Sequence, residues 1–155
     1  MKNTSLCYIE RDNQYLMLHR IKKEHDENAG KWIGVGGKFE EGESPEDCML
    51  REVKEETGLS LLSWRFRGII TFSYGSWETE YMHLFTADSF SGQLIDCDEG
   101  VLKWVDKDEL LSLPLWEGDK VFLKLLKTDC PFFSLKLCYD DEGNLQKSVL
   151  IGEEI

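Results

Sequence analysis

Short runs of apolar residues separated by polar turns cover most of the chain, and this spacing predicts a protein rich in β-strands. The runs 5–9 and 15–18 flank a polar segment and predict two strands joined by a turn. Residues 131–139 and 145–151 flank a segment rich in Asp, Gly and Asn, which predicts a hairpin near the end of the chain. Further strands are predicted at 61–74, 78–87 and 102–105.

Helical signals bracket residues 45–57. Ser44 is a favoured N-cap residue, and Pro45 suits the first helical turn. Gly58 suits the left-handed conformation that often ends a helix. The apolar residues of this helix recur on one arc, which predicts that it packs on a sheet; they are Met49, Leu50 and Val53.

A second helix is predicted later in the chain, from Lys120 to Lys127. Residues 115–119 open it, and a short helical turn at 107–111, ended by Pro114, precedes it. Strands on both sides of a central helix, with a second helix late in the chain, predict an α/β fold.

Three glutamates share one face of the first predicted helix. Glu52, Glu55 and Glu56 occupy positions i, i+3 and i+4. Like charges this close repel one another, and a cation would offset the repulsion. Mg²⁺ is commonly held by a few carboxylates while water and substrate phosphates fill its other positions. The face is therefore a candidate Mg²⁺ site, and the alternative is a solvated acidic helix face.

These glutamates belong to a longer pattern that covers residues 37–59. Its fixed positions are Gly37, Glu43, Arg51, Glu52, Val53, Glu55, Glu56, Gly58 and Leu59. The segment resembles the Nudix box at every defining position, and most of the chain is similar to the MutT-type oxidised-purine nucleoside triphosphatases. The resemblance implies a single Nudix hydrolase domain over residues 1–155. It also implies an α/β/α sandwich with a mixed β-sheet and a central catalytic helix.

The resemblance further implies a metal site with Mg²⁺ as the expected ion and Mn²⁺ as a substitute. The site combines the helix, a later acidic loop and the glycine-rich segment 31–38, which is expected to be a loop that approaches the ligand closely. The implied ligands are the Gly36 carbonyl and the side chains of Glu52, Glu55, Glu56 and Glu99.

Catalytic roles are expected for four residues of the motif. Hydrolysis requires a group that takes a proton from water, and either Glu52 or Glu55 could serve. Arg51 is always charged and is expected to hold the glutamates in place, with Glu43 as an ion-pair partner.

The resemblance places the nucleotide between the glycine-rich segment and several aromatic residues. Arg20, Gly37 and Lys38 are expected near the phosphates. Phe72 and Tyr74 alternate along one predicted strand, so they share a sheet face that is expected to line the base pocket. The other expected substrate contacts are Ser5, Trp116 and Asp119.

Several of these positions have structural alternatives. Arg20 could mark a solvated strand end, the two aromatic residues could belong to an ordinary core, and Asp119 could simply favour a helix N-terminus. Two positions also depart from mammalian relatives. Ile33 replaces an asparagine that contacts the purine, and Gly118 replaces an acidic residue. The Ile33 side chain cannot form a hydrogen bond with a base.

Composition narrows the range of partners. The formal charge of −12 weighs against duplex nucleic acid or capped RNA as the main ligand, and no stable nucleic-acid complex is expected. The five cysteines are dispersed, without a Cys-x-x-Cys pair, which indicates a reducing compartment. With neither a signal-peptide pattern nor a membrane-spanning run, a cytoplasmic monomer or simple homo-oligomer is expected.

The function that this resemblance favours is Mg²⁺-dependent hydrolysis of 8-oxo-dGTP to 8-oxo-dGMP and pyrophosphate. One alternative is a broader pyrophosphatase that acts on nucleoside triphosphates or on diphosphate derivatives such as ADP-ribose and nucleotide sugars. A non-catalytic nucleotide sensor is a second alternative. It is less favoured because a sensor has no need for the three glutamates.

Overall fold

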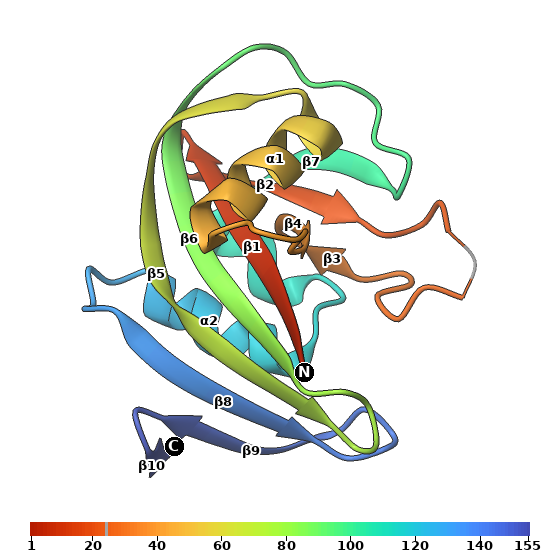
Figure 1. Ribbon diagram of the computed structural model, residues 1–155, viewed down its shortest axis with the longest axis vertical. Helices are drawn as coiled ribbons and strands as arrows, with labels where there is room; N and C mark the ends of the chain where they lie inside the picture. The colour runs from red at the N-terminus through yellow and green to blue at the C-terminus, as the bar shows by residue number, and fades with distance from the viewer. Residues whose placement is uncertain (24) are drawn as a thin grey trace.

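The computed structural model describes residues 1–23 and 25–155 and contains an extended β-sheet (Figure 1). The strands are β1 (Lys2–Arg11), β2 (Gln14–His19), β3 (Trp32–Ile33), β4 (Val35–Lys38), β5 (Ser60–Tyr74), β6 (Glu80–Ser91), β7 (Val101–Asp106), β8 (Phe133–Tyr139), β9 (Leu145–Leu150) and β10 (Glu153–Glu154). The helices are α1 (Pro45–Thr57), the 3₁₀ helix η1 (Lys107–Ser112) and α2 (Glu117–Leu126).

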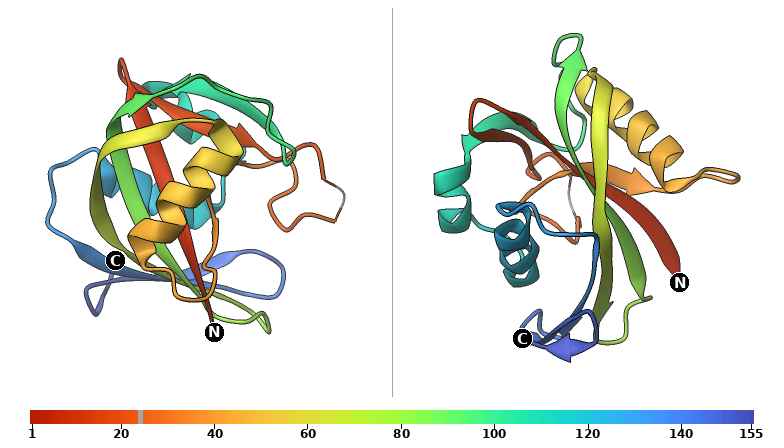
Figure 2. Two further views of the ribbon diagram at one scale, coloured as in Figure 1. Left: turned by 45° about the horizontal axis from the view of Figure 1, so that its top comes forward. Right: turned by 90° about the vertical axis from the view of Figure 1, so that its left-hand side faces the viewer.

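The sheet is mixed and is covered on both faces. Its strand order is β10-β9-β8-β5-β6-β1-β2-β3, with β4 paired to β1 and β7 to β2. β1 runs parallel to β6 and β5 runs parallel to β8. α1 lies on one face, whereas η1 and α2 lie on the other (Figure 2). The predicted α/β/α sandwich is confirmed. Within the described ranges, no helix is long and apolar enough to cross a membrane.

Each face of the sheet has its own apolar core. Under α1, Met49 and Val53 are fully buried and pack with strand residues such as Phe85, while Leu50 packs at the margin. Under α2, Phe122 is fully buried against the opposite sheet face. The apolar arc of α1 therefore faces the sheet as predicted, and its burial fixes which way the glutamate face points.

Both ends of α1 are formed by the predicted residues. The Ser44 hydroxyl accepts a hydrogen bond from the Asp47 N–H at 3.0 Å, and the Asp47 carboxylate accepts one from the Ser44 N–H at 3.1 Å. Gly58 is left-handed, with φ of 82°, and its N–H donates to the carbonyl of Lys54. A Cβ at Gly58 would also lie only 2.6 Å from the Gln93 carbonyl oxygen.

The expectation that residues 31–38 form a loop is wrong. Most of them belong to β3 and β4, and β4 pairs with β1 so that Gly36 lies opposite Leu6 and Gly37 opposite Ser5. A Cβ at Gly36 would lie 1.9 Å from the Ser5 carbonyl oxygen. The glycine at this position therefore permits close strand pairing, a contact between segments far apart in sequence that local turn chemistry does not reveal.

Several element boundaries also differ from the predicted ones. β1 begins at Lys2 and β6 at Glu80 because these two residues pair across the parallel strands. β6 continues to Ser91, which pairs with Ser60. α2 begins at Glu117, earlier than expected, and β10 was not predicted. The first three differences arise from long-range strand pairing, which periodicity in a short window does not detect.

Replacing Ser44 with alanine removes the side chain that caps the Asp47 N–H. We expect Ser44→Ala to lower the free energy of unfolding by about 1 kcal/mol, measured by urea unfolding. Ser134→Ala, at an exposed position on β8, is the control and should change the value by less than about 0.5 kcal/mol. Equal stabilities of the two variants would show that the cap does not stabilise α1.

Candidate active site

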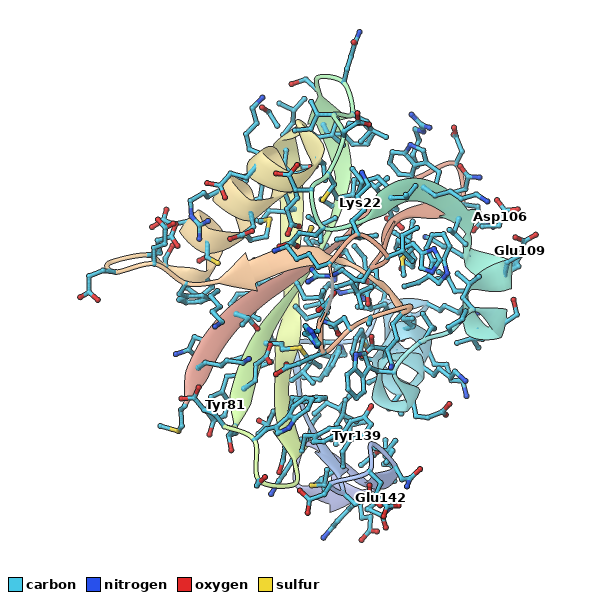
Figure 3. The ribbon with its side chains drawn as sticks, turned by 90° about the vertical axis from the view of Figure 1, so that its right-hand side faces the viewer. Lys22, Tyr81, Asp106, Glu109, Tyr139 and Glu142 are labelled. Atoms are coloured by element: carbon cyan, nitrogen blue, oxygen red, sulfur yellow. The ribbon has the colours of Figure 1, made fainter. Side chains whose placement is uncertain are left out.

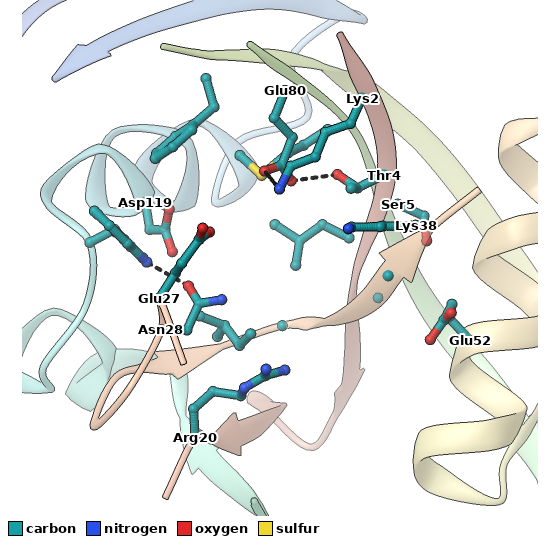
Figure 4. Close-up of a pocket in the computed structure, with 18 of the residues that line it drawn as sticks. Lys2, Thr4, Ser5, Arg20, Glu27, Asn28, Lys38, Glu52, Glu80 and Asp119 are labelled. Atoms are coloured by element: carbon teal, nitrogen blue, oxygen red, sulfur yellow. Dashed lines mark hydrogen bonds and ion pairs between the residues drawn. The ribbon is translucent and has the colours of Figure 1, made fainter. Parts of the chain in front are cut away.

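A cavity of about 380 Å³ extends from α1 toward α2 along the sheet (Figure 4). It gathers residues that lie far apart in the sequence. The predicted site residues that line it are Ser5, Arg20, Gly36, Gly37, Lys38, Glu52, Glu56, Phe72, Glu99, Trp116 and Asp119. Those outside the lining are Glu43, Arg51, Glu55 and Tyr74. Tyr74 instead lines a neighbouring cavity together with Trp77 and Trp116.

Carboxylates gather at the α1 end of the cavity. The Glu52 carboxylate packs against Gly37, where an added Cβ would lie 2.5 to 2.7 Å from its atoms. Glu56, one turn further along α1, is buried and accepts a hydrogen bond from the Gly36 N–H at 3.2 Å. The glycines of β4 thus let the strand lie directly against the acidic face of α1.

Glu99 reaches the same end of the cavity from the segment before β7. Burial, followed by the negative charge of Glu99 and a hydrogen bond with it, raises the pKa of Glu56. Burial also opposes ionisation of Glu99, but hydrogen bonds from Lys23 and Glu56 and the charge of Arg20 leave its pKa lowered. Arg20 donates to Glu99 at 2.6 Å. Burial and neighbouring negative charge thus oppose ionisation of Glu56 more strongly than that of Glu99.

Arg51 connects α1 to the segment that precedes it. Its Nε and Nη2 donate to both oxygens of Glu43 at 2.8 and 2.9 Å, so the predicted ion pair forms. Its Nη1 donates to Glu52 at 2.7 Å and to Glu55 at 3.2 Å. Its Nη2 also donates to the Lys38 carbonyl at 3.0 Å. The hydrogen bonds from Arg51 lower the pKa of Glu43 to about 2.

The donor set at this end suits a hard divalent cation. Glu52, Glu56 and Glu99 supply oxygen ligands. Burial and the negative charge of Glu99 raise the pKa of Glu56, an effect that a bound cation would oppose. Within the ranges 1–23 and 25–155, no three Asp, Glu, His or Cys side chains already form a metal-binding group. The carboxylates are held apart by contacts with arginines, because Arg51 binds Glu52 and Arg20 binds Glu99.

Aromatic side chains line the other end of the cavity. The rings of Phe72 and Trp116 are 5.5 Å apart and nearly perpendicular, at 83°. The Trp116 Nε1 donates to Asn28 at 2.7 Å, which fixes the orientation of the indole. Asp119 lies beside them, and burial raises its pKa to about 8. A protonated Asp119 can donate a hydrogen bond to a base.

Gly118, which replaces an acidic residue of mammalian relatives, lies close to two side chains of β8. The Gly118 N–H donates to the Tyr139 hydroxyl at 2.6 Å. Tyr139 itself belongs to β8 and is labelled in Figure 3. A Cβ at Gly118 would lie 2.5 Å from the Leu137 side chain and 2.6 Å from that hydroxyl. The start of α2 therefore sits too close to β8 for any side chain at this position without local rearrangement.

The cavity also contains residues that the sequence did not single out. They are Lys2, Thr4, Leu6, Glu27, Asn28, Gly34, Trp77, Glu80 and Met82; Ile33, noted above as a departure, lines it as well. Strand register brings several of them here, because Glu80 pairs with Phe72 on one side and with Lys2 on the other. Counting across the two predicted strands from Phe72 could have suggested Glu80. Asn28 follows from no local signal.

Comparison with known proteins identifies the family. The NUDIX domain model matches residues 2–126, so the chain belongs to the Nudix hydrolase family. Over 124 residues it is 32% identical to the uncharacterized Nudix hydrolase YvcI of Bacillus subtilis, covering 77% of this chain and 75% of that protein. Nudix hydrolases generally require a divalent metal ion.

Two further matches define the branch of the family. The chain is 38% identical over 99 residues to the oxidized purine nucleoside triphosphate hydrolase of Mus musculus, covering 63% of this chain and 64% of that protein. The crystal structure of a MutT protein from Bacillus halodurans superposes with a TM-score of 0.87 at 28% identity, covering 97% of each chain. The protein is a MutT-type Nudix hydrolase.

The buried Asp119 predicts a pH effect on stability. Its pKa is about 8 in the folded protein, against an ordinary value of 3.8. Between these two values the folded state retains a proton that the unfolded chain releases. The stabilisation of the folded state by protonated Asp119 is therefore complete below about pH 4 and is lost as the pH rises through about 8. In EDTA, we expect Asp119→Asn to flatten the fall in Tm between about pH 5.5 and 8.5.

The exposed Asp129 provides the control for this measurement. Asp129→Asn should keep the wild-type dependence of Tm on pH. If Asp119→Asn also kept it, the Asp119 carboxylate would be charged throughout this range, and its proposed role as a donor would be lost.

Proposed function

We propose that the protein hydrolyses 8-oxo-dGTP to 8-oxo-dGMP and pyrophosphate with Mg²⁺. The observation that carries this proposal is a single cavity with carboxylates at one end and aromatic side chains with a buried aspartate at the other. Such a cavity suits a ligand that has phosphates at one end and a flat base at the other. The name of the mouse relative supports the oxidised purine.

The α1 end would bind the triphosphate. Glu52, Glu56 and Glu99, with the Gly36 carbonyl, would hold Mg²⁺, and Arg20 and Lys38 would contact phosphate oxygens. When bound, the ion neutralises charge on the phosphate oxygens and lowers the pKa of the attacking water.

The sequence offered Glu52 and Glu55 as candidate acceptors of the water proton, and we propose Glu52. It lines the cavity, whereas the Glu55 side chain is 59% exposed and is paired with Arg51. Arg51 would fix the Glu52 carboxylate in the position from which it accepts the proton, and Glu43 would hold Arg51.

The opposite end would bind the base. Phe72 and Trp116 offer apolar faces and edges for contact with the ring, and Asp119 in its protonated form would donate to an acceptor atom on the base edge. Residues 1–155 would act as one Nudix domain, because the sheet runs from Lys2 to Glu154.

A broader nucleoside triphosphate pyrophosphatase is the second candidate. Ile33 favours it, because this apolar side chain lines the cavity and offers a base no hydrogen bond. Weaker recognition of the base would leave hydrolysis intact and reduce discrimination between substrates.

The first test compares kcat/KM for 8-oxo-dGTP and dGTP, with Mg²⁺, by release of pyrophosphate. We expect a preference of about a hundredfold or more, equivalent to about 2.7 kcal/mol of transition-state discrimination. Equal rates would support the broader pyrophosphatase instead. Turnover of neither nucleotide would contradict both candidates.

The metal assignment is tested by Glu56→Gln. We expect kcat/KM to fall by about a hundredfold or more, because a neutral amide is a poor Mg²⁺ ligand. The Tm in EDTA should not fall, because the neutral amide has nearly the same shape and its oxygen can still accept the hydrogen bond from the Gly36 N–H. The exposed Glu41→Gln is the control for activity. Near-normal turnover by Glu56→Gln would remove Glu56 from the metal site.

A further inference from the structure

A second acidic side chain faces the aromatic end of the cavity. Glu80 on β6 pairs with Phe72 on β5 and with Lys2 on β1, so the three residues form one row across three strands. Directly paired residues on neighbouring strands project from the same face of a sheet. All three residues line the cavity, together with Asp119 from α2.

The Glu80 carboxylate is held by its neighbours, but its oxygens can accept further hydrogen bonds. The Thr4 hydroxyl donates to one oxygen at 2.7 Å, and the Lys2 ammonium lies 3.5 Å from the other (Figure 4). An ionised carboxylate offers about four lone-pair sites. Each oxygen therefore retains capacity for a further donor, and the Glu80 side chain is 18% exposed.

Electrostatics give Glu80 and Asp119 different roles in one cavity. Burial is the main cause of the raised pKa of Asp119, and the negative charge of Glu80 adds to it. The Lys2 ammonium lies beside the Glu80 carboxylate, and the Thr4 hydroxyl donates a hydrogen bond to it. The cavity thus presents an acceptor-only carboxylate at Glu80 and a carboxyl group that can donate at Asp119.

Two adjacent acceptor oxygens match a ligand edge that presents two parallel N–H donors. Guanine offers this pair, in N1–H and the 2-amino group. The corresponding edge of adenine or cytosine has one amino group beside an unprotonated ring nitrogen, and that nitrogen would meet a carboxylate oxygen without a proton between them. A hydrogen-bonding site of this kind discriminates strongly against a base that lacks the donor.

We propose that Glu80 is a specificity-determining residue whose carboxylate accepts hydrogen bonds from N1–H and the 2-amino group of a 2-amino-6-oxopurine nucleotide. This assignment rests on the proposed function, because it takes the base to lie against Phe72 and Trp116. It adds the base edge that is recognised and the residue that recognises it.

The test removes the 2-amino group from the substrate and the charge from the protein. kcat/KM is measured for 8-oxo-dGTP and 8-oxo-dITP, and in parallel for dGTP and dITP, in wild type and Glu80→Gln. We expect wild type to prefer the amino-bearing nucleotide of each pair by roughly tenfold or more. Glu80→Gln should bring this ratio close to one.

Glu78→Gln is the matched control. Glu78 is exposed, pairs with the N-terminus and is not among the residues that line the cavity. Glu78→Gln should keep the wild-type ratio of kcat/KM values. The Tm of wild type, Glu80→Gln and Glu78→Gln should be the same. If Glu80→Gln were less stable, Glu80→Ala would be measured as a second variant and should show the same change in ratio. A loss of stability alone does not change the ratio, because it compares two substrates on one protein.

The outcomes separate this inference from the proposed function. An unchanged ratio in Glu80→Gln, or an equal loss with both members of a pair, would overturn the role of Glu80 while leaving the hydrolase intact. A wild-type ratio near one would do the same. If wild type hydrolysed none of the four nucleotides, the proposed function and the role of Glu80 would both fail.

Discussion

The guanidinium of Arg51 is the contact on which the acidic end of the cavity depends. It binds Glu43 through two hydrogen bonds and also contacts Glu52, Glu55 and the Lys38 carbonyl. Without a cation among them, the carboxylates of α1 would repel one another and the segment between β4 and α1 would lose its attachment to the helix. A planar group with five donors can satisfy several such partners at once, whereas a lysine ammonium cannot match this geometry.

Close backbone packing complements this charge network. Gly36 lies against the Ser5 carbonyl, and Gly37 lies against the Glu52 carboxylate. The same residues that permit β4 to pair with β1 therefore bring the strand against the acidic face of α1. These contacts both stabilise the fold and shape the site. Two neighbours, Arg51 and the strand β4, therefore fix the position of Glu52.

The sequence predicted most of the acidic end, and at the aromatic end it predicted Phe72, Trp116 and Asp119 but not the residues beside them on the strands. The helix, its caps and its glutamate face follow from periodicity within one segment, and the structure has them as expected. By contrast, Glu80 and Lys2 reach the cavity only through the register of β5, β6 and β1. Tyr74 was grouped correctly on one sheet face with Phe72, yet it lines the neighbouring cavity. Such placements depend on contacts between distant segments, which local patterns do not encode.

The two ends of the cavity are built by different elements. α1 and β4 supply the carboxylates and the backbone beside them, whereas β5, β6 and α2 supply the aromatic end. Under the proposed function, substitutions at the aromatic end would change which base is bound without disturbing the residues that carry out hydrolysis. This division of labour makes the scaffold modular, and it offers a route by which one catalytic helix could serve many nucleotide preferences as a family diversifies.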